Sequence, residues 1–508
     1  MPDTASPTTD TPTTNRPANA LPDSAPAGVP ALGNIERLLA SITAIVGPTG
    51  ILTGPADTAA YVEDWRKLYR GRTPAVVRPS DTAQLSDVVR LCAEAGVHVV
   101  PQGGNTSMVG GAVPAEDGTE IVISTARMNR IRAIDSVDMT MTIEAGVTLK
   151  AAQLAATDAG CLLPLSISSE GSAQIGGVLA VNAGGNNTVR YGNARDLVLG
   201  LEVVLPDGQV WNGLRRLRKD NTGYHLRHLL VGAEGTLGVV TAAVLRLEPR
   251  PKELVVAFCA LPSAEAASAL FRRVRGEDPA ALQAFEYMSG AGVRLVLRHI
   301  PGVSVPVAAP AEHYVLLELA TPRAGAGLRA ALEDLLAAAM EDGTVLDAAL
   351  AESEAQRGAM WKLREEHSEA QKREGASVKN DVSVPTSRVA AFIAAADDAC
   401  ARLMPGIRPM PFGHFGDGNV HYNLLCPDGM DKAVFEARGH EIMDAVNEVV
   451  RTFDGSFSAE HGVGQLKAYM MPDWRGGAEL DAMRHIKGAL DPLGLMNPGK
   501  IFPTSGAN

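Results

Sequence analysis

The sequence predicts an α+β protein built from more than one domain. The chain has 508 residues, which exceeds what a single hydrophobic core usually supports. Apolar strand patterns alternate with amphipathic helix patterns from about residue 73 onward. After Pro251 the composition changes, because alanine-rich helices begin to alternate with apolar strands. We therefore expect a first domain at 31–250, a second at 251–455 and a small, mostly helical C-terminal region at 456–508.

Residues 1–30 differ from the rest of the chain. They are rich in Pro, Thr, Ala and Asp, they lack the apolar segment of a signal peptide, and they hold a single arginine. This composition predicts a disordered tail.

The first helix of the alternating region has clear boundary signals. Asp81 can cap its N-terminus, with Gln84 three residues later, and Gly96 ends it. A buried strand at 97–100 follows and leads into a glycine-rich loop. The other elements predicted in this half are strands at 120–124 and 139–145, a helix at 148–159, a hairpin at 201–211 that turns at Asp207-Gly208, and a strand at 239–249.

The second half is predicted to contain fewer strands and longer helices. The predicted strands lie at 253–259 and 314–319, and the predicted helices at 263–274, 325–341, 353–373 and 385–403.

Charge and cysteine content exclude several classes of partner and site. The formal net charge of −12 argues against nucleic acid or an anionic membrane surface as a partner. Five scattered cysteines without CxxC spacing predict free thiols in a reducing compartment, so we expect a cytoplasmic protein. The sequence contains no run of about 18 apolar residues, so it predicts no membrane span.

Two glycine-rich segments dominate the first half, PQGGNTSMVGGAVP at 101–114 and SEGSAQIGGVLAVNAGG at 169–185. Backbone amides of such loops can bind a pyrophosphate, particularly where a helix begins. Ordinary turns are the alternative. Neither segment matches the usual NAD or ATP fingerprint.

A cluster of histidines and a glutamate near the C-terminus predicts a catalytic metal site. His414 and His421 flank a Gly-Asp-Gly-Asn turn, and Glu460 arrives in SAEHGVG at 458–464. Two imidazoles and one carboxylate leave a coordination position open, which is typical of catalytic zinc, whereas a structural metal usually takes four ligands. His461 is then available as a proton acceptor.

Two further polar residues lie in the same hairpin. Asn423 follows His421 by two positions and shares its face of the strand, so it either binds a substrate or makes an ordinary cross-strand contact. Asp417 is expected to form the turn.

Six motifs resemble one family, in matching order over roughly residues 40–505. They are PQGGNTSMVGGA, SEGSAQIGGVLAVNAGGNN, DNTGYHLRHLLVGAEGTLGVVT, GHFGDGNVHYN, SAEHGVG and LMNPGK. Together they resemble the FAD-linked D-2-hydroxyacid dehydrogenases of the vanillyl-alcohol-oxidase superfamily, particularly the D-2-hydroxyglutarate dehydrogenases.

The resemblance implies FAD bound across a two-lobed domain at 31–250, with an α+β substrate domain and a C-terminal region that completes the active site. It implies non-covalent FAD, because 103–106 contains neither histidine nor cysteine. The implied cofactor contacts are Pro101, Gln102, Gly103, Gly104, Asn105, Thr106, Gly110, Gly111, Pro164, Gly171, Ser172, Gly176, Gly177, Asn182, Val240 and Asn497.

The family also places a metal at the positions of His414, His421 and Glu460, with His461 beside the substrate. This ligand set suits Zn²⁺ best, and Co²⁺ or Mn²⁺ can substitute. We expect oxidation of a D-2-hydroxy acid by hydride transfer to flavin N5, with His461 as the base.

Arg364, Ser368 and Lys379 fall where the family's 2-hydroxyglutarate enzymes hold the distal carboxylate. Arg364 and Ser368 share one face of the helix predicted at 353–373, and Lys379 lies on the strand expected next. From pattern alone, charged residues on such a helix normally face solvent.

Two rival functions remain open at this point. One is a D-lactate dehydrogenase on the same scaffold, and the other is an FAD-dependent transferase resembling alkylglycerone-phosphate synthase. The electron acceptor is not identified by any motif. The resemblance to this family also implies a homodimer.

Overall fold

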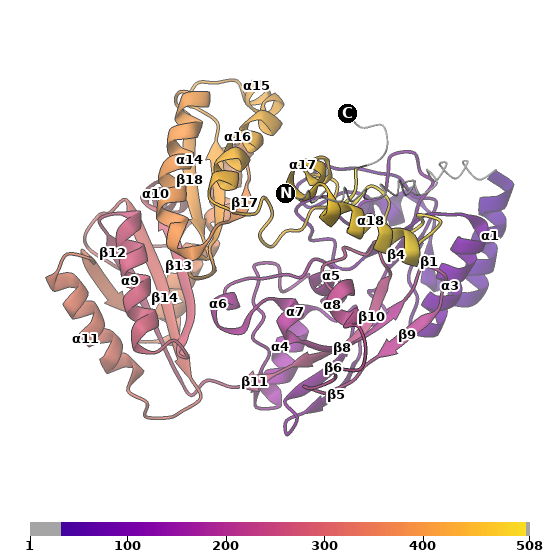
Figure 1. The fold of residues 1–508 in the computed structure, drawn as a ribbon, viewed down its shortest axis with the longest axis horizontal. Helices are drawn as coiled ribbons and strands as arrows, with labels where there is room; N and C mark the ends of the chain where they lie inside the picture. The colour runs from indigo at the N-terminus through magenta and orange to yellow at the C-terminus, as the bar shows by residue number, and fades with distance from the viewer. Residues whose placement is uncertain (1–31, 504–508) are drawn as a thin grey trace, which may run out of the picture.

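The structure, a computed structural model, describes residues 32–503, so the tail predicted at 1–30 lies outside the described residues. Two bodies make up the fold. The first half of the chain forms the right-hand body in Figure 1, and most of the second half forms the left-hand body around a larger sheet. The α+β fold class is confirmed.

The first half contains short strands and mostly short helices. Its helices are α1 (Leu32–Val46), α2 (Pro55–Thr58), α3 (Thr82–Ala95), α4 (Leu149–Asp158), α5 (Ile175–Ala180), α6 (Thr188–Tyr191), α7 (Ala194–Leu197) and α8 (Leu226–Leu230). Its strands are β1 (Ile51–Leu52), β2 (Val76–Val77), β3 (Val99–Gln102), β4 (Ile121–Ser124), β5 (Ile131–Asp135), β6 (Thr140–Glu144), β7 (Cys161–Leu162), β8 (Val198–Val204), β9 (Val210–Gly213), β10 (Val239–Arg246) and β11 (Glu248–Pro249).

Two sheets form the two lobes of this half. The order β1-β2-β4-β3 makes a small sheet in which β2, β4 and β3 are parallel. The order β5-β6-β10-β8-β9 makes an antiparallel sheet. As predicted, the Asp81 side chain caps α3 by accepting the Gln84 N–H at 2.9 Å, and Gly96 ends α3 with φ 65°.

The second half is built on one antiparallel sheet in the order β15-β12-β14-β13-β18-β19-β16, with β17 also paired to β19. Its strands are β12 (Glu253–Leu261), β13 (Leu282–Ser289), β14 (His313–Thr321), β15 (Asp347–Leu350), β16 (Ser377–Val378), β17 (Asp381–Ser383), β18 (Arg408–Gly413) and β19 (Asn419–Leu425). Its helices are α9 (Ala264–Glu277), α10 (Gly290–His299), α11 (Leu328–Glu341), α12 (Glu354–Glu365), α13 (His367–Glu374), α14 (Val389–Leu403), α15 (Lys432–Ala437) and α16 (Gly439–Thr452).

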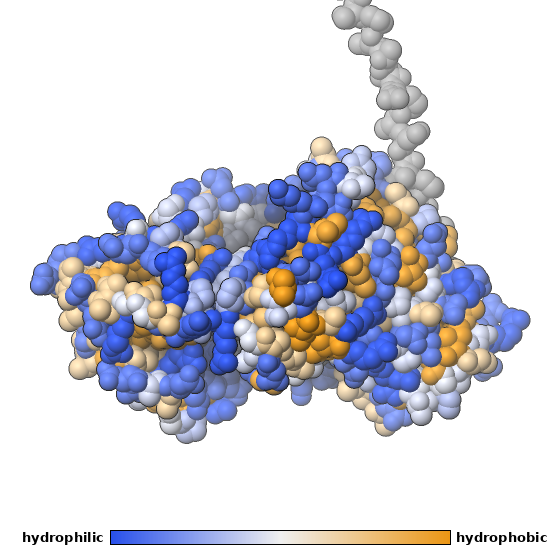
Figure 2. All heavy atoms as spheres, turned by 90° about the horizontal axis from the view of Figure 1, so that it is seen from below, coloured by the Kyte–Doolittle hydropathy of each residue, from blue (hydrophilic) through white to orange (hydrophobic). Residues whose placement is uncertain are grey.

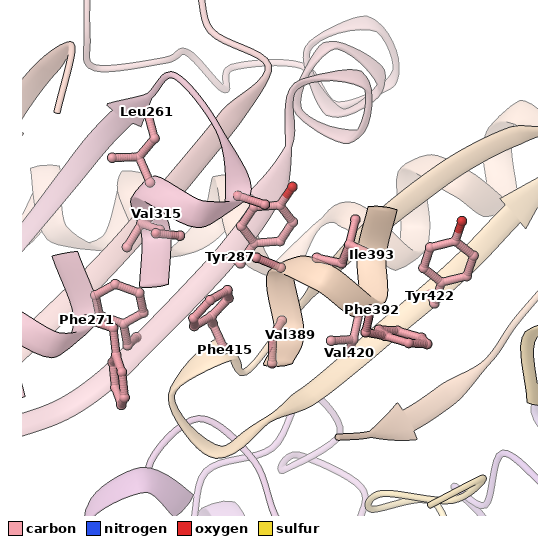
Figure 3. Packing of buried hydrophobic residues seen from close by; sticks show 14 of the residues in the cluster. Leu261, Phe271, Tyr287, Val315, Val389, Phe392, Ile393, Phe415, Val420 and Tyr422 are labelled. Carbon is pink, nitrogen blue, oxygen red and sulfur yellow. The ribbon is translucent and has the colours of Figure 1, made fainter. Parts of the chain in front are cut away.

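Apolar side chains between this sheet and its helices form the largest core. Phe271 of α9 packs with Phe285 of β13 and Phe415 at ring-centroid distances of 5.1 to 6.3 Å. Figure 3 shows Phe415, which lies in the hairpin between His414 and His421, beside Tyr287 and Val389. The core therefore supports the back of that hairpin.

The C-terminal region returns to the first half. It contains α17 (Met471–Arg475) and α18 (Ala478–Leu490), drawn in yellow over the right-hand body in Figure 1. The Asn497 N–H donates to the Val99 carbonyl oxygen at 2.8 Å, and Lys487 Nζ donates to the Thr236 carbonyl oxygen. Residues that follow the SAEHGVG motif are thus anchored beside the first glycine-rich loop.

The structure departs from the sequence prediction in two places near the site. The helix predicted at 353–373 is two helices, α12 and α13, which are separated at Glu366. The strand predicted to carry Lys379 is interrupted between β16 and β17, because the Asn423 side chain accepts the Asn380 N–H in place of a ladder partner. Lys379 therefore lies in a short irregular segment.

Hydrophilic side chains cover much of the face shown in Figure 2, and the hydrophobic ones form scattered groups. Among the described residues, no helix has the length and apolar character needed to cross a membrane.

Candidate active site

A tight hairpin places the first two predicted metal ligands. His414 directly follows β18, and His421 lies in β19, where it pairs with Phe412. The Asp417 side chain accepts the Asn419 N–H at 3.0 Å, so Asp417 forms the turn as predicted. The two imidazole rings end with centroids 5.5 Å apart.

The loop with Glu460 and His461 is held by two buried carboxylates from different parts of the chain. Asp381 Oδ2 accepts the N–H groups of Glu460 and His461 at 3.0 and 2.9 Å. Glu234 accepts the N–H groups of Val463 and Gly464 at 2.7 and 2.8 Å. Because Glu234 comes from the first half and Asp381 from the second, this loop joins the two bodies.

Three imidazole nitrogens surround one carboxylate oxygen. The Nε2 atoms of His414, His421 and His461 lie 3.6, 3.5 and 3.9 Å from Glu460 Oε1. Zinc ligands about 2.0–2.2 Å from a metal in tetrahedral geometry lie about 3.3–3.6 Å from one another. The distances from Glu460 to His414 and to His421 therefore each fit two ligands of one divalent ion.

The other ring nitrogen of each histidine faces a carboxylate. His414 Nδ1 lies 2.9 Å from Glu286 Oε1, and the Nδ1 atoms of His421 and His461 lie 3.7 and 3.4 Å from the two oxygens of Asp381. A carboxylate at Nδ1 fixes the tautomer and leaves Nε2 as the free lone pair. The sequence analysis found neither Glu286 nor Asp381.

A second donor set overlaps the first. Asp381, His421, Glu460 and His461 each place one potential ligand atom within 4.8 Å of the others. The Asp381 oxygens already accept two backbone N–H groups and the Asn419 amide, so they are occupied as hydrogen-bond acceptors. This argues that Asp381 orients the histidines, while the Glu460 carboxylate is the one available to bind an ion.

Charges inside the cluster shift the pKa values of its members. Burial opposes the charged form of His414, yet the adjacent Glu286 carboxylate raises the pKa of His414 well above its usual value. Burial likewise opposes ionisation of Glu460, but His414 and His421 lower the pKa of Glu460 to about 2. Burial lowers the pKa of His421 to about 3, which keeps this ring neutral and able to bind a metal.

One cavity of about 540 Å³ joins this cluster to both glycine-rich segments. A Cβ at Gly104 would overlap the Ser172 carbonyl oxygen, and one at Gly103 would lie 3.3 Å from the Gly177 nitrogen. The two loops therefore approach each other closely only because these positions lack side chains.

These loops fit the predicted FAD. Asn105, in the first loop, holds a left-handed backbone conformation with φ 52°, and its Oδ1 atom is buried without a hydrogen-bond partner. Strained backbone and unsatisfied polar atoms together indicate a ligand site. The predicted cofactor residues that line the cavity are Pro101, Gly103, Gly104, Asn105, Thr106, Gly111, Ser172 and Gly177.

The remaining predicted cofactor residues do not line this cavity. Gln102 donates to the carbonyl oxygens of Tyr61 and Ala112, and the Asn182 side chain accepts the Arg195 N–H. Asn497 donates to the Gly111 carbonyl oxygen and so supports the loop. The others are Gly110, Pro164, Gly171, Gly176 and Val240.

All four predicted substrate residues line the cavity. Arg364 is buried and lies against Glu286, with Nε to Oε2 at 2.8 Å and Nη2 to Oε2 at 2.6 Å. The Asn423 amide donates to Gln371 and accepts the Asn380 N–H, so cross-strand contacts occupy part of it. Ser368 and Lys379 complete the group.

Several residues on the cavity wall carried no sequence signal that we used. Trp65 and Arg66 come from a segment without a recognised motif. Glu234 lies within GAEGTLG, part of one of the six motifs, and Asp381 lies two residues after Lys379 in the segment expected to form a strand. For Glu234 and Asp381, the available signal was a polar residue inside a glycine-rich or buried segment.

Comparisons with known proteins agree over most of the chain. Residues 73–213 match the family model of an FAD binding domain, and residues 250–501 match that of FAD linked oxidases, C-terminal domain. The chain is 38% identical to a D-2-hydroxyglutarate dehydrogenase of Xanthomonas citri pv. viticola, over 90% of this chain and 94% of that one. It is also 38% identical to the mitochondrial D-2-hydroxyglutarate dehydrogenase of Bos taurus, over 92% and 84% of the two chains.

Solved structures share the fold at low sequence identity. A p-cresol methylhydroxylase with substrate bound has a TM-score of 0.71 at 15% identity, covering 95% of this chain and 99% of that one. An alkyldihydroxyacetonephosphate synthase has a TM-score of 0.70 at 16% identity, covering 92% and 85%.

Proposed function

This chain belongs to the FAD-linked D-2-hydroxyacid dehydrogenases of the vanillyl-alcohol-oxidase superfamily, and we propose that it oxidises D-2-hydroxyglutarate to 2-oxoglutarate. The observation that carries the proposal is the shared cavity. It brings the glycine-rich loops, the histidine cluster and the cations Arg364 and Lys379 to one space. The names of the relatives in Xanthomonas citri and Bos taurus agree with this substrate.

The chemistry divides between bound groups and the chain's own residues. FAD supplies the hydride acceptor, and a divalent metal, best Zn²⁺, supplies a Lewis acid for the C2 hydroxyl and C1 carboxylate. His414, His421 and Glu460 would hold this metal. Oxidation removes a proton from the C2 hydroxyl and a hydride from C2, so the protein must provide a proton acceptor beside the metal.

His461 is the proton acceptor in this proposal. Its Nδ1 lies 3.4 Å from Asp381, and its Nε2 points toward the metal ligands. Because Asp381 faces Nδ1, Nε2 is the ring nitrogen that accepts the proton, and the Asp381 charge stabilises the imidazolium that forms. Asp381 also accepts the backbone N–H of His461, so it holds this residue at both its backbone and its side chain.

The far end of the substrate carries a second carboxylate. Lys379 lines the cavity and makes no ion pair within 4.0 Å in the described part of the chain. A monocarboxylate such as lactate leaves this cation unpaired, whereas a dicarboxylate neutralises it. The Asn423 amide is positioned to hydrogen-bond the substrate through the donor that Gln371 does not use.

Anaerobic bleaching of the bound flavin tests the proposal. We expect rapid loss of the oxidised flavin band with D-2-hydroxyglutarate and none with its L-enantiomer. Preferred bleaching by D-lactate would instead assign a D-lactate dehydrogenase. Absence of bleaching by every hydroxy acid would favour an FAD-dependent transferase. The homodimer stays a prediction, and no electron acceptor is assigned.

A further inference from the structure

The cavity wall contains a cation from the first half of the chain that the proposed mechanism does not use. Arg66 lines the same cavity as Lys379, which comes from the second half. Within residues 32–503, neither side chain lies within 4.0 Å of a carboxylate. By contrast, Arg364 is paired with Glu286, with Nε and Nη2 at 2.8 and 2.6 Å from Oε2. Arg66 and Lys379 therefore present positive charge to the cavity without an ion pair, as does Lys467, whose ammonium is instead held by hydrogen bonds to the Phe457 carbonyl oxygen and the Ser458 hydroxyl.

A rigid turn presents Arg66 to the cavity. The Asp64 side chain accepts the N–H groups of Arg66 and Tyr69 at 3.0 and 2.7 Å. Lys67, next in the chain, holds a left-handed backbone conformation with φ 59°. A non-glycine residue in this conformation persists only where its surroundings hold it, and such strain gathers at ligand sites.

The same turn is tied to the first glycine-rich loop. The Asn105 side chain donates to the Glu63 carbonyl oxygen at 2.9 Å, and Arg66 Nη1 lies 3.4 Å from the Met108 carbonyl oxygen. Arg66 is thus positioned by the loop that we expect to bind the cofactor. Its remaining donors have no protein partner among the hydrogen bonds of the described residues.

Trp65 brings the two halves together at this point. Its half-exposed ring lies 5.9 Å from Lys379 Nζ and 4.8 Å from Lys372 Nζ. Cations over an aromatic ring are attracted to it without being neutralised. Burial together with Arg66 and Lys372 lowers the pKa of Lys379 to about 8, against an opposing influence of Glu369, which is consistent with positive charges crowded together without a carboxylate at ion-pair distance.

We propose that Arg66 and Lys379 form a clamp, one cation from each half of the chain, which binds the distal carboxylate of the substrate and selects dicarboxylates. This inference rests on the proposed function. A planar guanidinium opposite an ammonium suits a carboxylate, which has two oxygens to share. Arg364, neutralised by Glu286, supplies donors and shape but no net charge.

The pyrophosphate of FAD is the other anion that Arg66 could meet. The backbone cradle for a pyrophosphate lies where Gly103 and Gly104 meet Ser172 and Gly177. Lys379, however, is two residues from Asp381, which orients His461. The position of Lys379 therefore places the clamp on the substrate side, and the FAD content of a variant separates the two possibilities.

The test compares Arg66→Met with Arg70→Met in the FAD-loaded enzyme. Arg70 lies in the same segment, but its side chain is 77% exposed and pairs only with Glu63. The probes are D-2-hydroxyglutarate and D-2-hydroxyvalerate, which replaces the distal carboxylate with a methyl group. The readouts are FAD per chain and the second-order rate constant for anaerobic flavin reduction by each acid.

We expect Arg66→Met to lose about 10- to 100-fold with D-2-hydroxyglutarate and less than about threefold with D-2-hydroxyvalerate, at unchanged FAD content. Arg66→Lys should recover part of the loss, and Arg70→Met should behave as wild type. An Arg66→Met, Lys379→Met double variant should lose less than the product of the single losses, because both cations bind one carboxylate.

Three results would overturn the clamp. They are reduced FAD content in Arg66→Met, equal losses with both acids, and an unchanged rate with D-2-hydroxyglutarate. If wild-type enzyme is not reduced by D-2-hydroxyglutarate at all, the proposed function itself has failed. The two failures are therefore distinguishable.

Discussion

The two ends of the cavity treat buried charge in opposite ways. At the metal end, Glu286 pairs with both Arg364 and His414, and Asp381 faces both His421 and His461. At the distal end, Arg66 and Lys379 have no carboxylate within 4.0 Å among the described residues, although Glu369 lies in the same cavity wall. Paired charges build a rigid site before the substrate arrives. Unpaired charges make the site depend on the charge that the substrate brings.

The largest effect is expected when the proposed proton acceptor at the metal end of the cavity, His461, is removed. His461→Ala should lower turnover by about 10³-fold or more, because no other ring next to the metal ligands can accept the proton. FAD and metal content should stay at wild-type levels. His440→Ala, at an exposed histidine beside Tyr469, is the matched control. Near-normal turnover of His461→Ala would remove His461 from the mechanism.

The next largest effect is expected when the Glu286 carboxylate is removed from the metal end of the cavity. Glu286→Gln leaves both Arg364 and His414 without their carboxylate, and we expect a stability loss of about 3–5 kcal/mol. Metal affinity should fall by about 10- to 100-fold, because His414 loses the partner at its Nδ1. Thermal unfolding and bound metal measure the two effects.

Glu63→Gln provides the comparison for this variant. Its partner Arg70 is exposed, so the expected stability loss is about 0–1 kcal/mol. Equal stability losses in the two variants would contradict the distinction between buried and exposed pairs.

A smaller effect sharpens the comparison through pH. The pKa of Lys379 is lowered to about 8 by burial and by Arg66 and Lys372, against an opposing influence of Glu369. Below pH 8 Lys379 is charged and binds a carboxylate, and above pH 8 it loses its proton. The apparent Kd for D-2-hydroxyglutarate should therefore rise above pH 8, by up to about tenfold per pH unit. Lys379→Met should bind weakly at every pH without this rise, and a rise that persists would assign it to another group.

The smallest effect concerns Trp65. Trp65→Leu removes the ring that lies near Lys372 and Lys379, and each such contact contributes about 0.5–1 kcal/mol at an exposed site. The KM for D-2-hydroxyglutarate should rise about two- to fivefold at unchanged kcat. An effect on kcat of the same size would indicate that Trp65 acts on the chemical step.

Sequence reasoning succeeded where the signal was local. The Asp81 cap and the Gly96 end of α3 depend on a few adjacent residues, and both are confirmed. His414 and His421 flank one short turn, and Glu460 stands in a second short motif, so the cluster was visible without a fold. These residues come together as expected, and their binding of a metal stays a prediction.

Sequence reasoning failed where contacts between residues far apart in the chain decide the arrangement of the site. Glu286 reaches His414 across 128 positions, and no pattern near Glu286 marks it as a partner. Arg66 and Lys379 line the same cavity only because the two halves of the chain face each other. The strand predicted through Lys379 was wrong because a side chain, Asn423, replaces a ladder hydrogen bond. Tertiary structure overrides local pattern at each of these positions.

The central claim is that the metal end and the FAD loops act on one substrate in one cavity. Anaerobic flavin reduction by D-2-hydroxyglutarate, measured before and after chelation and again after Zn²⁺ is restored, tests it most directly. We predict that reduction requires one metal ion per chain, stops on chelation without loss of FAD, and returns with the metal. Undiminished reduction by the metal-free enzyme would contradict the account.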